Sequence, residues 1–148
     1  MNKLEEYIEI VNYDVKEYPF GNSFDYIVSN PPYMKVDGKK QNDLSSKAIA
    51  RHEIKSFCFF PSTLDLYDLV KNAKRLLKPM GSFTLVHRSY RFIKISRVLE
   101  ESGFSIKRVR FVYFSKDKNS NLVLIEAWKG KKCQLEIEPP LFLEESGY

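Results

Sequence analysis

The feature that most constrains the fold is an apolar run, Tyr26 to Val28, that passes through Ser29 into the turn Asn30-Pro31-Pro32-Tyr33. Two consecutive prolines remove two backbone donors and fix the backbone, so the run ends at this point. A short apolar run bounded by such a turn is typical of a buried parallel strand in an α/β sheet. Because α/β proteins bind ligands where such strands end, we expect a binding site at this turn.

The turn carries groups that suit a planar substrate with an amino group, such as adenine. The amide oxygen of Asn30 and the carbonyl of Pro31 accept hydrogen bonds, and Tyr33 offers a ring for stacking. The alternative interpretation is that Asn-Pro only opens a turn and that the tyrosine packs against the core.

Residues 25–33, DYIVSNPPY, resemble motif IV of the class I S-adenosylmethionine-dependent methyltransferases that modify exocyclic amino groups. The blocks at 48–53, 86–88 and 121–126, with Pro139-Pro140-Leu141, resemble the bacterial branch that methylates adenine in tRNA. The proline turn also occurs in glutamine methyltransferases that act on release factors and in DNA adenine methyltransferases. The Ala-Arg-His-Glu string within 48–53 favours the tRNA branch.

The resemblance implies methyl transfer from S-adenosylmethionine to the exocyclic amino group of adenine in tRNA, without a metal. It implies catalytic roles for Asn30, Pro31 and Tyr33, and cofactor contacts from Asp14 and Asn30. Five further residues are assigned to substrate binding: Pro32, Lys35, Arg51, His87 and Arg88.

Two alternatives to this function stay open. The same chemistry could act on a glutamine side chain of a protein, or the chain could be a non-catalytic truncated fragment. The family carries a glycine-rich cofactor loop, whereas all six glycines here are isolated, and Met1 resembles an internal position. The resemblance therefore implies an α/β fold that forms the C-terminal portion of a Rossmann-like class I methyltransferase sheet, ending in an antiparallel hairpin.

Length and composition fit one domain over residues 1–148. No apolar run has the length of a membrane span and no signal peptide is evident, so we expect a cytoplasmic protein without a membrane partner. The two cysteines, Cys58 and Cys133, lack metal-ligand spacing, so we expect reduced thiols and no zinc.

The net charge of +5 is mild, but basic residues form two clusters. Each cluster fits either a solvated face or attraction to RNA phosphates. The first cluster follows the proline turn, and this position favours RNA binding for that cluster. The clusters are Lys35, Lys39, Lys40, Lys47 and Arg51, and Lys107, Arg108 and Arg110.

Periodicity predicts the remaining elements. We expect strands over 7–11, 24–29, 82–87, 105–114, 121–128 and, more weakly, 134–138, with 105–114 and 121–128 antiparallel. We expect helices over 48–54, over 64–77 with Ser62 or Thr63 as N-cap, and over 90–102 with Gly103 as C-cap. A turn is expected at 78–81, and core packing is expected for Trp128.

The resemblance also implies that strand 24–29 lacks its neighbouring strand and forms a bare sheet edge. Exposed apolar edges pair readily with other chains, so we expect a homodimer through this edge, exchange of elements or poor solubility.

Overall fold

The computed structural model describes residues 7–31, 34–35, 52–53 and 65–144. In chain order the elements are β1 (Phe24–Ser29), β2 (Met34–Lys35), β3 (His52–Glu53), α2 (Leu66–Leu76), β4 (Leu77–Arg88), the 3-10 helix η2 (Ser89–Arg91), α3 (Phe92–Glu101), β5 (Phe104–Tyr113), β6 (Leu122–Lys129), β7 (Glu136–Ile137) and β8 (Leu141–Phe142).

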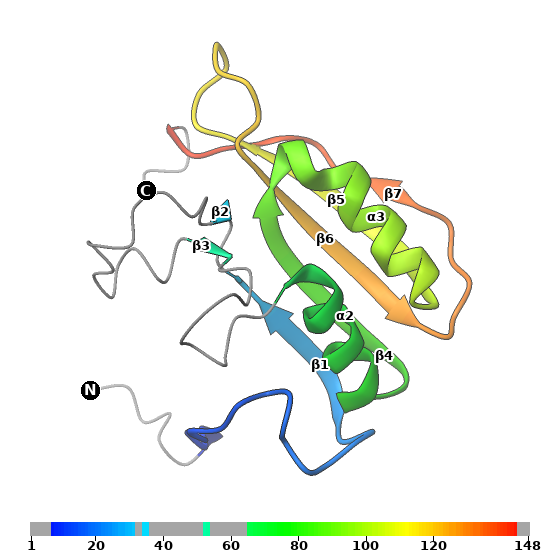
Figure 1. The fold of residues 1–148 in the computed structure, drawn as a ribbon. Helices are drawn as coiled ribbons and strands as arrows, with labels where there is room; N and C mark the ends of the chain where they lie inside the picture. Colours follow the sequence, from blue (N-terminus) through cyan, green and yellow to red (C-terminus); the bar gives the residue numbers. More distant parts are fainter. Residues whose placement is uncertain (1–6, 32–33, 36–51, 54–64, 145–148) are drawn as a thin grey trace.

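These elements form a mixed six-stranded sheet with the order β1-β4-β6-β5-β7, in which β8 also pairs with β5 (Figure 1). Strand β1 is parallel to β4, whereas β6 is antiparallel to both β4 and β5. The C-terminal strands β7 and β8 run parallel to β5 along its outer edge. This confirms the expected α/β class and the antiparallel hairpin at the end of the sheet. Strands β2 and β3 form a separate parallel pair.

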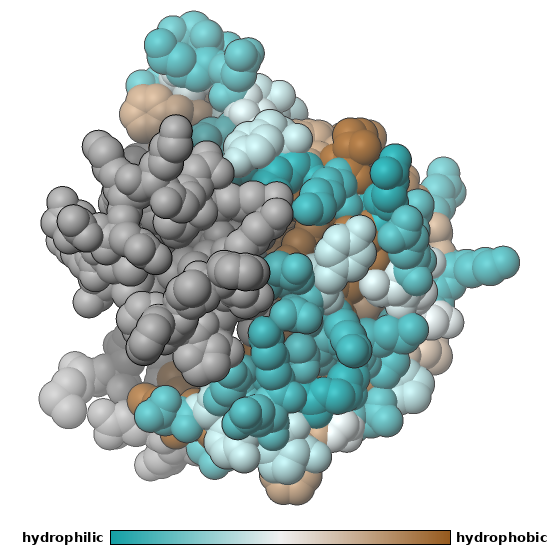
Figure 2. Space-filling model, viewed as in Figure 1, coloured by the Kyte–Doolittle hydropathy of each residue, from teal (hydrophilic) through white to brown (hydrophobic). Residues whose placement is uncertain are grey.

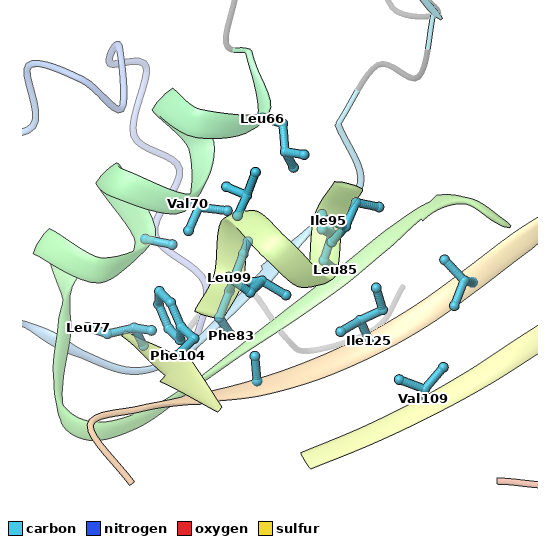
Figure 3. Packing of buried hydrophobic residues seen from close by; sticks show 14 residues of the cluster. Leu66, Val70, Leu77, Phe83, Leu85, Ile95, Leu99, Phe104, Val109 and Ile125 are labelled. Carbon is cyan, nitrogen blue, oxygen red and sulfur yellow. The ribbon is translucent and has the colours of Figure 1, made fainter. Parts of the chain in front are cut away.

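Helices α2 and α3 pack on the same face of the sheet (Figure 1). Val70 of α2 and Leu99 of α3 are fully buried with Phe83 and Leu85 of β4 and Ile125 of β6 (Figure 3). The outward surface over these helices is largely hydrophilic (Figure 2). Each helix therefore has one apolar side, which its periodicity predicts, and the core lies between the two helices and the sheet.

The ends of both helices follow ordinary capping chemistry. The carboxylate of Asp65 accepts a hydrogen bond of 2.8 Å from the backbone N–H of Asp68, so Asp65 is the N-cap of α2 instead of Ser62 or Thr63. Gly103 follows α3 with a φ of 81° and donates its N–H to the carbonyl of Glu100, which confirms its expected capping role.

The expected turn at 78–81 is instead an irregularity inside β4. Strand β4 begins at Leu77, directly after α2, and residues 78–81 lie opposite a single residue of β1, Asp25. Met80 adopts a φ of 65°, and a Cβ at Gly81 would come within 3.0 Å of the carbonyl oxygens of Asp25 and Lys78. Residues 78–81 thus form a bulge that restores the pairing of β1 with β4 at Ser82.

Three other expectations were wrong. Residues 7–11 form no strand, and Tyr7 and Ile10 are largely exposed, because no described strand lies beside this run. Strand β1 has its predicted bounds but is not buried, since it is the outermost strand. Trp128 is half-buried rather than packed in the core, because it lies on the sheet face opposite the helices.

The helix expected over 48–54 falls mostly outside the described residues. Its described part, His52–Glu53, is extended and pairs with β2, which contradicts a helix at these two positions. Main-chain pairing with Met34 and Lys35 explains the extended backbone.

Candidate cofactor and substrate site

A hollow of about 300 Å³ lies where β1 ends and α2 passes over it. Its lining is mainly apolar and comes from three segments: Val15, then Ile27, Val28, Ser29 and Pro31, and finally Leu69, Asn72 and Ala73 of α2. A volume of about 300 Å³ is at the small end for ligand pockets and suits one ring system rather than a whole cofactor.

The loop that contributes Val15 is attached to α2 by Arg75. One guanidinium nitrogen, Nη1, donates to the carbonyl of Tyr18 at 2.7 Å, and Nη2 donates to the carbonyl of Val15 at 2.9 Å. Nη2 also donates to Oδ1 of Asn72 at 3.3 Å. Arg75 therefore positions the loop against the helix and keeps Val15 at the hollow.

A salt bridge of 2.8 Å between Lys16 and Asp68 joins the same loop to α2. The hydrogen bond to Asp68 raises the pKa of Lys16, against the lowering effect of partial burial, and the charges of Asp68, Asp14 and Asp65 add to the rise. The loop therefore has a second, charged attachment to the first turn of α2.

Asp14, to which the family resemblance assigns a cofactor contact, precedes Val15 and is half-buried. Its Oδ1 accepts the N–H of Lys16 at 2.9 Å, and its carbonyl accepts the N–H of Glu17 at 2.9 Å. The carboxylate is thus held in a tight local turn beside the residue that lines the hollow.

The predicted catalytic residues that the structure describes lie directly after β1. Asn30 is exposed, and the half-buried Pro31 lines the hollow together with Val15. Lys35 belongs to β2. Pro32, Tyr33 and Arg51 lie outside the described residues. The structure therefore brings the loop after Asp14 and the start of the proline turn to one hollow.

His87 and Arg88 lie at the end of β4, the neighbour of β1. His87 is completely buried; its Nδ1 accepts the N–H of Arg88 at 2.8 Å, and its Nε2 lies 3.3 Å from Nη1 of Arg91. Arg88 donates to Oδ1 of Asn121 at 2.5 Å. These contacts hold the end of β4 to η2 and to the loop before β6, and the substrate role of both residues stays a prediction.

The second basic cluster is paired with acidic residues. Arg108 lies 2.6 Å from Glu126 and 3.2 Å from Glu138, and Lys107 lies 3.7 Å from Glu136. Arg110 donates to the carbonyl of Pro139 at 3.0 Å. These ion pairs join β5 to β6 and to the C-terminal segment, which favours a structural role for this cluster over phosphate binding. Apart from Lys35, the first cluster lies outside the described residues.

Sequence reasoning missed Asn72 and Arg75. Asn72 is a buried polar residue in the apolar stripe of α2, where its Nδ2 donates to the carbonyl of Asp68. In the sequence, the signal that could have identified Asn72 is a polar side chain among the apolar positions of the helix, between Leu69 and Ala73. Arg75 gave no signal, because basic residues are expected in the last turn of any helix.

The family model described as Eco57I restriction-modification methylase matches residues 1–123. The chain belongs to this methylase family. A tRNA1(Val) (adenine(37)-N6)-methyltransferase of Parabacteroides distasonis is 31% identical over 147 residues, which cover 93% of this chain and 58% of the relative. A release factor glutamine methyltransferase of Clostridium acetobutylicum is 32% identical over 106 residues, covering 68% of this chain and 35% of the relative.

The fold is likewise that of a methyltransferase. A predicted O-methyltransferase from Agrobacterium tumefaciens superposes with a TM-score of 0.57 at 16% identity, covering 83% of this chain and 44% of that chain. This likeness confirms the expected fold class. The chain spans about half the length of the curated adenine methyltransferases that it matches.

The described residues offer neither a metal site nor a membrane-spanning helix. No group of three or more His, Cys, Asp or Glu residues is placed to hold a metal ion, and no helix is long and apolar enough to cross a membrane. Cys133 is a free thiol whose Sγ contacts the carbonyls of Ser105 and Ile106.

Proposed function

We propose that the chain contributes the acceptor side of an S-adenosylmethionine-dependent methyltransferase that modifies the exocyclic amino group of adenine in tRNA. The observation that carries the proposal is the hollow shared by Val15 and Pro31, directly beside the Asn-Pro-Pro-Tyr turn. Membership of the methylase family and relatives named for adenine methylation in tRNA support it.

The residues present suit one part of the cofactor. An apolar hollow of about 300 Å³ suits the adenine ring, and the Asp14 carboxylate beside Val15 is an acceptor for the amino group of that ring. Asn30 at the end of β1 borders the same place. When bound, S-adenosylmethionine supplies an electrophilic methyl group on a positively charged sulfur.

The proline turn accounts for activation of the acceptor. An aromatic amino nitrogen is a poor nucleophile because its lone pair is delocalised into the ring. The Asn30 side-chain oxygen and the Pro31 carbonyl accept its two hydrogens, which favours a tetrahedral nitrogen with a directed lone pair. Tyr33 stacks on the base and fixes its plane, so most of the acceleration comes from positioning and polarisation.

The remaining assignments concern RNA. Pro32, Lys35, Arg51 and Arg88 are proposed to hold the target nucleotide and neighbouring phosphates, with His87 fixing the end of β4. The target base turns out of its stack to reach the site. A tRNA substrate also implies a cytoplasmic location.

A second candidate is methylation of a glutamine side chain in a protein. The release factor glutamine methyltransferase relative favours it, and a glutamine amide presents the same two hydrogens to Asn30 and Pro31. The two functions differ in the acceptor and share the chemistry of the turn.

Titration with S-adenosylhomocysteine tests the cofactor hollow. We expect calorimetry to detect binding to the 148-residue chain, and Val15→Trp to weaken it at least tenfold by filling the hollow. Val11→Trp is the matched control, since Val11 is exposed and does not line the hollow. Equal binding by both variants would contradict this location, and binding by neither the chain nor its variants would support the non-catalytic alternative.

Methyl transfer to a tRNA transcript and to a release factor, compared under identical conditions, identifies the acceptor. We expect transfer to tRNA, reduced about 10²–10³-fold by Asn30→Ala, the size typical for loss of one polarising group. Transfer to the release factor alone would establish the second candidate. Full activity of Asn30→Ala would contradict the catalytic assignment.

A further inference from the structure

Two aromatic side chains are exposed at the end of the sheet where β1 and β4 end. Tyr90 of η2 is 76% exposed, and Phe114, directly after β5, is 56% exposed. Strands β4 and β5 are both antiparallel to β6, and β1 is parallel to β4, so β1, β4 and β5 end at one edge of the sheet. Tyr90 and Phe114 therefore share this edge with the proline turn.

The loop between β5 and β6 is attached to the end of β4. Ser89 donates its backbone N–H to the carbonyl of Asn121 at 3.2 Å and its hydroxyl to the carbonyl of Ser120 at 2.5 Å. Arg88 donates to Oδ1 of the same asparagine at 2.5 Å. Figure 1 shows the loop projecting beyond the sheet at the end where α3 begins. The loop and η2 thus form one surface that is organised before any ligand binds.

The loop turns tightly and carries more positive than negative charge. Asp117 accepts the hydroxyl of Ser115 at 2.5 Å, which lowers the pKa of its carboxyl group, and lies 3.8 Å from Lys118. Lys116 and Lys118 outnumber this single acidic residue of the loop, and Arg88 at the base of the loop adds a third positive charge. The projecting loop is mostly hydrophilic (Figure 2).

We call this surface the edge platform; it consists of Arg88, Tyr90, Phe114, Lys116 and Lys118. Exposed aromatic rings among basic side chains are typical of surfaces that bind single-stranded nucleic acid, because the rings stack on bases and the charges attract phosphates. The bases of a duplex are already stacked on one another, and a peptide lacks the regular negative charge of a nucleic acid. The edge platform therefore suits unpaired nucleotides.

The platform also lies at a suitable distance from the proline turn. Neighbouring strands of a sheet are about 4.8 Å apart, so β6 and β5 lie roughly 10 and 15 Å from β1. A few nucleotides of a single strand span this distance. Nucleotides next to a target base at Asn30 can therefore reach Tyr90 and Phe114.

We propose that the edge platform binds unpaired nucleotides beside the target adenine, with its two rings stacked on bases and its basic side chains close to phosphates. This inference rests on the proposed methyl transfer to adenine in tRNA and adds the surface that selects RNA as the acceptor. The proline turn offers the same two hydrogen-bond acceptors to adenine and to a glutamine side chain. Discrimination between these acceptors therefore requires contacts outside the turn, which the edge platform provides.

RNA binding by the 148-residue chain, measured without a methyl donor, tests the proposal. The probes are a fluorescent oligoadenylate, a duplex RNA of equal length and a tRNA1(Val) transcript, the RNA for which the relatives are named. We expect tighter binding of the single strand and the transcript than of the duplex. Tyr90→Ala and Phe114→Ala should each weaken binding of the single strand about tenfold. Tyr90→Phe should bind within about twofold of the unmodified chain, since it keeps the ring.

Tyr26→Ala is the matched control for the rings, because Tyr26 is 77% exposed and lies inside β1, away from the end of the strand. For the charges, Lys118→Ala should reduce the slope of log affinity against log salt by about 0.7. Lys132→Ala should leave this slope unchanged, since Lys132 is exposed beyond the opposite end of β6. Circular dichroism establishes that each variant folds.

Equal affinity for single-stranded and duplex RNA, equal losses in Tyr90→Ala and Tyr26→Ala, or no RNA binding by the unmodified chain would overturn the proposal. Binding of a release factor that is lost in Tyr90→Ala would assign the platform to a protein partner and would also overturn it. RNA binding that depends on Tyr90 but is followed by no methyl transfer would contradict the proposed function alone. Methyl transfer to tRNA that is unchanged in Tyr90→Ala would contradict this inference alone.

Discussion

The two edges of the sheet differ in whether a described segment of the chain covers them. The outer edge of β5 is covered by the C-terminal segment, which adds β7 and β8 and contributes Glu136 and Glu138 to ion pairs with Lys107 and Arg108. The outer edge of β1 has no described covering strand and exposes Tyr26 and Val28. The first edge is closed by the chain itself, and the described residues leave the second open beside the candidate site.

The basic residues on each side of the sheet attach a different segment of the chain. Lys107, Arg108 and Arg110 form a cluster that in the sequence alone fits RNA binding, but in the fold they hold the C-terminal segment to β5. Near β1, Arg75 and Lys16 use their charge to attach the loop that carries Asp14 and Val15. Among the described residues, basic side chains thus stabilise both sides of the sheet.

The largest expected effect comes from removing Glu126, which lies on the inner strand β6 and pairs with Arg108 of β5. Its carboxylate accepts hydrogen bonds from Arg108 at 2.6 Å, Trp128 at 2.7 Å and Ser82 at 3.2 Å, and so joins β4, β5 and β6. We expect Glu126→Ala to lower the free energy of unfolding by about 2–3 kcal/mol, measured by urea denaturation. Glu101→Ala, at an exposed position of α3, is the control, and equal losses would contradict the role of Glu126.

Arg75→Ala tests the attachment on the open side. Removing the hydrogen bonds to Val15, Tyr18 and Asn72 is expected to cost about 2 kcal/mol and to speed amide exchange over residues 14–18. Arg97→Ala, on the exposed side of α3, should change neither quantity by more than about 0.5 kcal/mol. Unchanged exchange over 14–18 in Arg75→Ala would show that the loop is held by other contacts.

The carboxylate of Glu126 should make the free energy of unfolding depend on pH. Burial raises the pKa of Glu126, but hydrogen bonds from Trp128 and Arg108 and the Arg108 charge outweigh it, so the pKa lies below the ordinary value of 4.5. A lowered folded pKa adds stability that is present above pH 4.5 and is lost as the pH falls through the folded value. Urea denaturation between about pH 3 and 6 should show this loss, and Glu126→Gln should lack this contribution.

The smallest expected effect on stability comes from the exposed β-branched residues at the two ends of the sheet. Val28→Thr and Ile137→Thr should each change the free energy of unfolding by less than about 0.5 kcal/mol, since Val28 is 75% and Ile137 68% exposed. Sedimentation velocity of both variants tests the sequence prediction that the edge of β1 also contributes to self-association, which Val28→Thr should weaken and Ile137→Thr should not. Equal behaviour would contradict the difference between the edges.

Local sequence signals were sufficient for much of the fold. Helix periodicity identified α2 and α3, Gly103 marked the end of α3, and the proline turn fixed the end of β1 at Ser29. These features depend on residues close together in the sequence. The expected catalytic turn likewise lies where a parallel strand ends, next to a hollow.

Features that depend on distant residues could not be predicted in the same way. The exposure of β1 follows from its position in the strand order, and the bonds of Arg75 span 57 and 60 positions. The pairing of Arg108 with Glu126 and Glu138 required the register of β5, β6 and the C-terminal segment. Hydrophobic periodicity contains no information on any of these.

The bulge at 78–81 has a consequence for tolerance to changes in chain length. Because these residues lie opposite Asp25 alone, a residue added or removed between Lys78 and Met80 can be absorbed there, and Tyr26 still pairs with Ser82. The residues from Tyr26 to Ser29 pair one to one with β4, so an insertion or deletion there cannot be absorbed. It would displace Asn30 by one position along β4. Insertions and deletions among relatives should therefore collect in the bulge, which isolates the site from variation in the segment that joins α2 to the sheet.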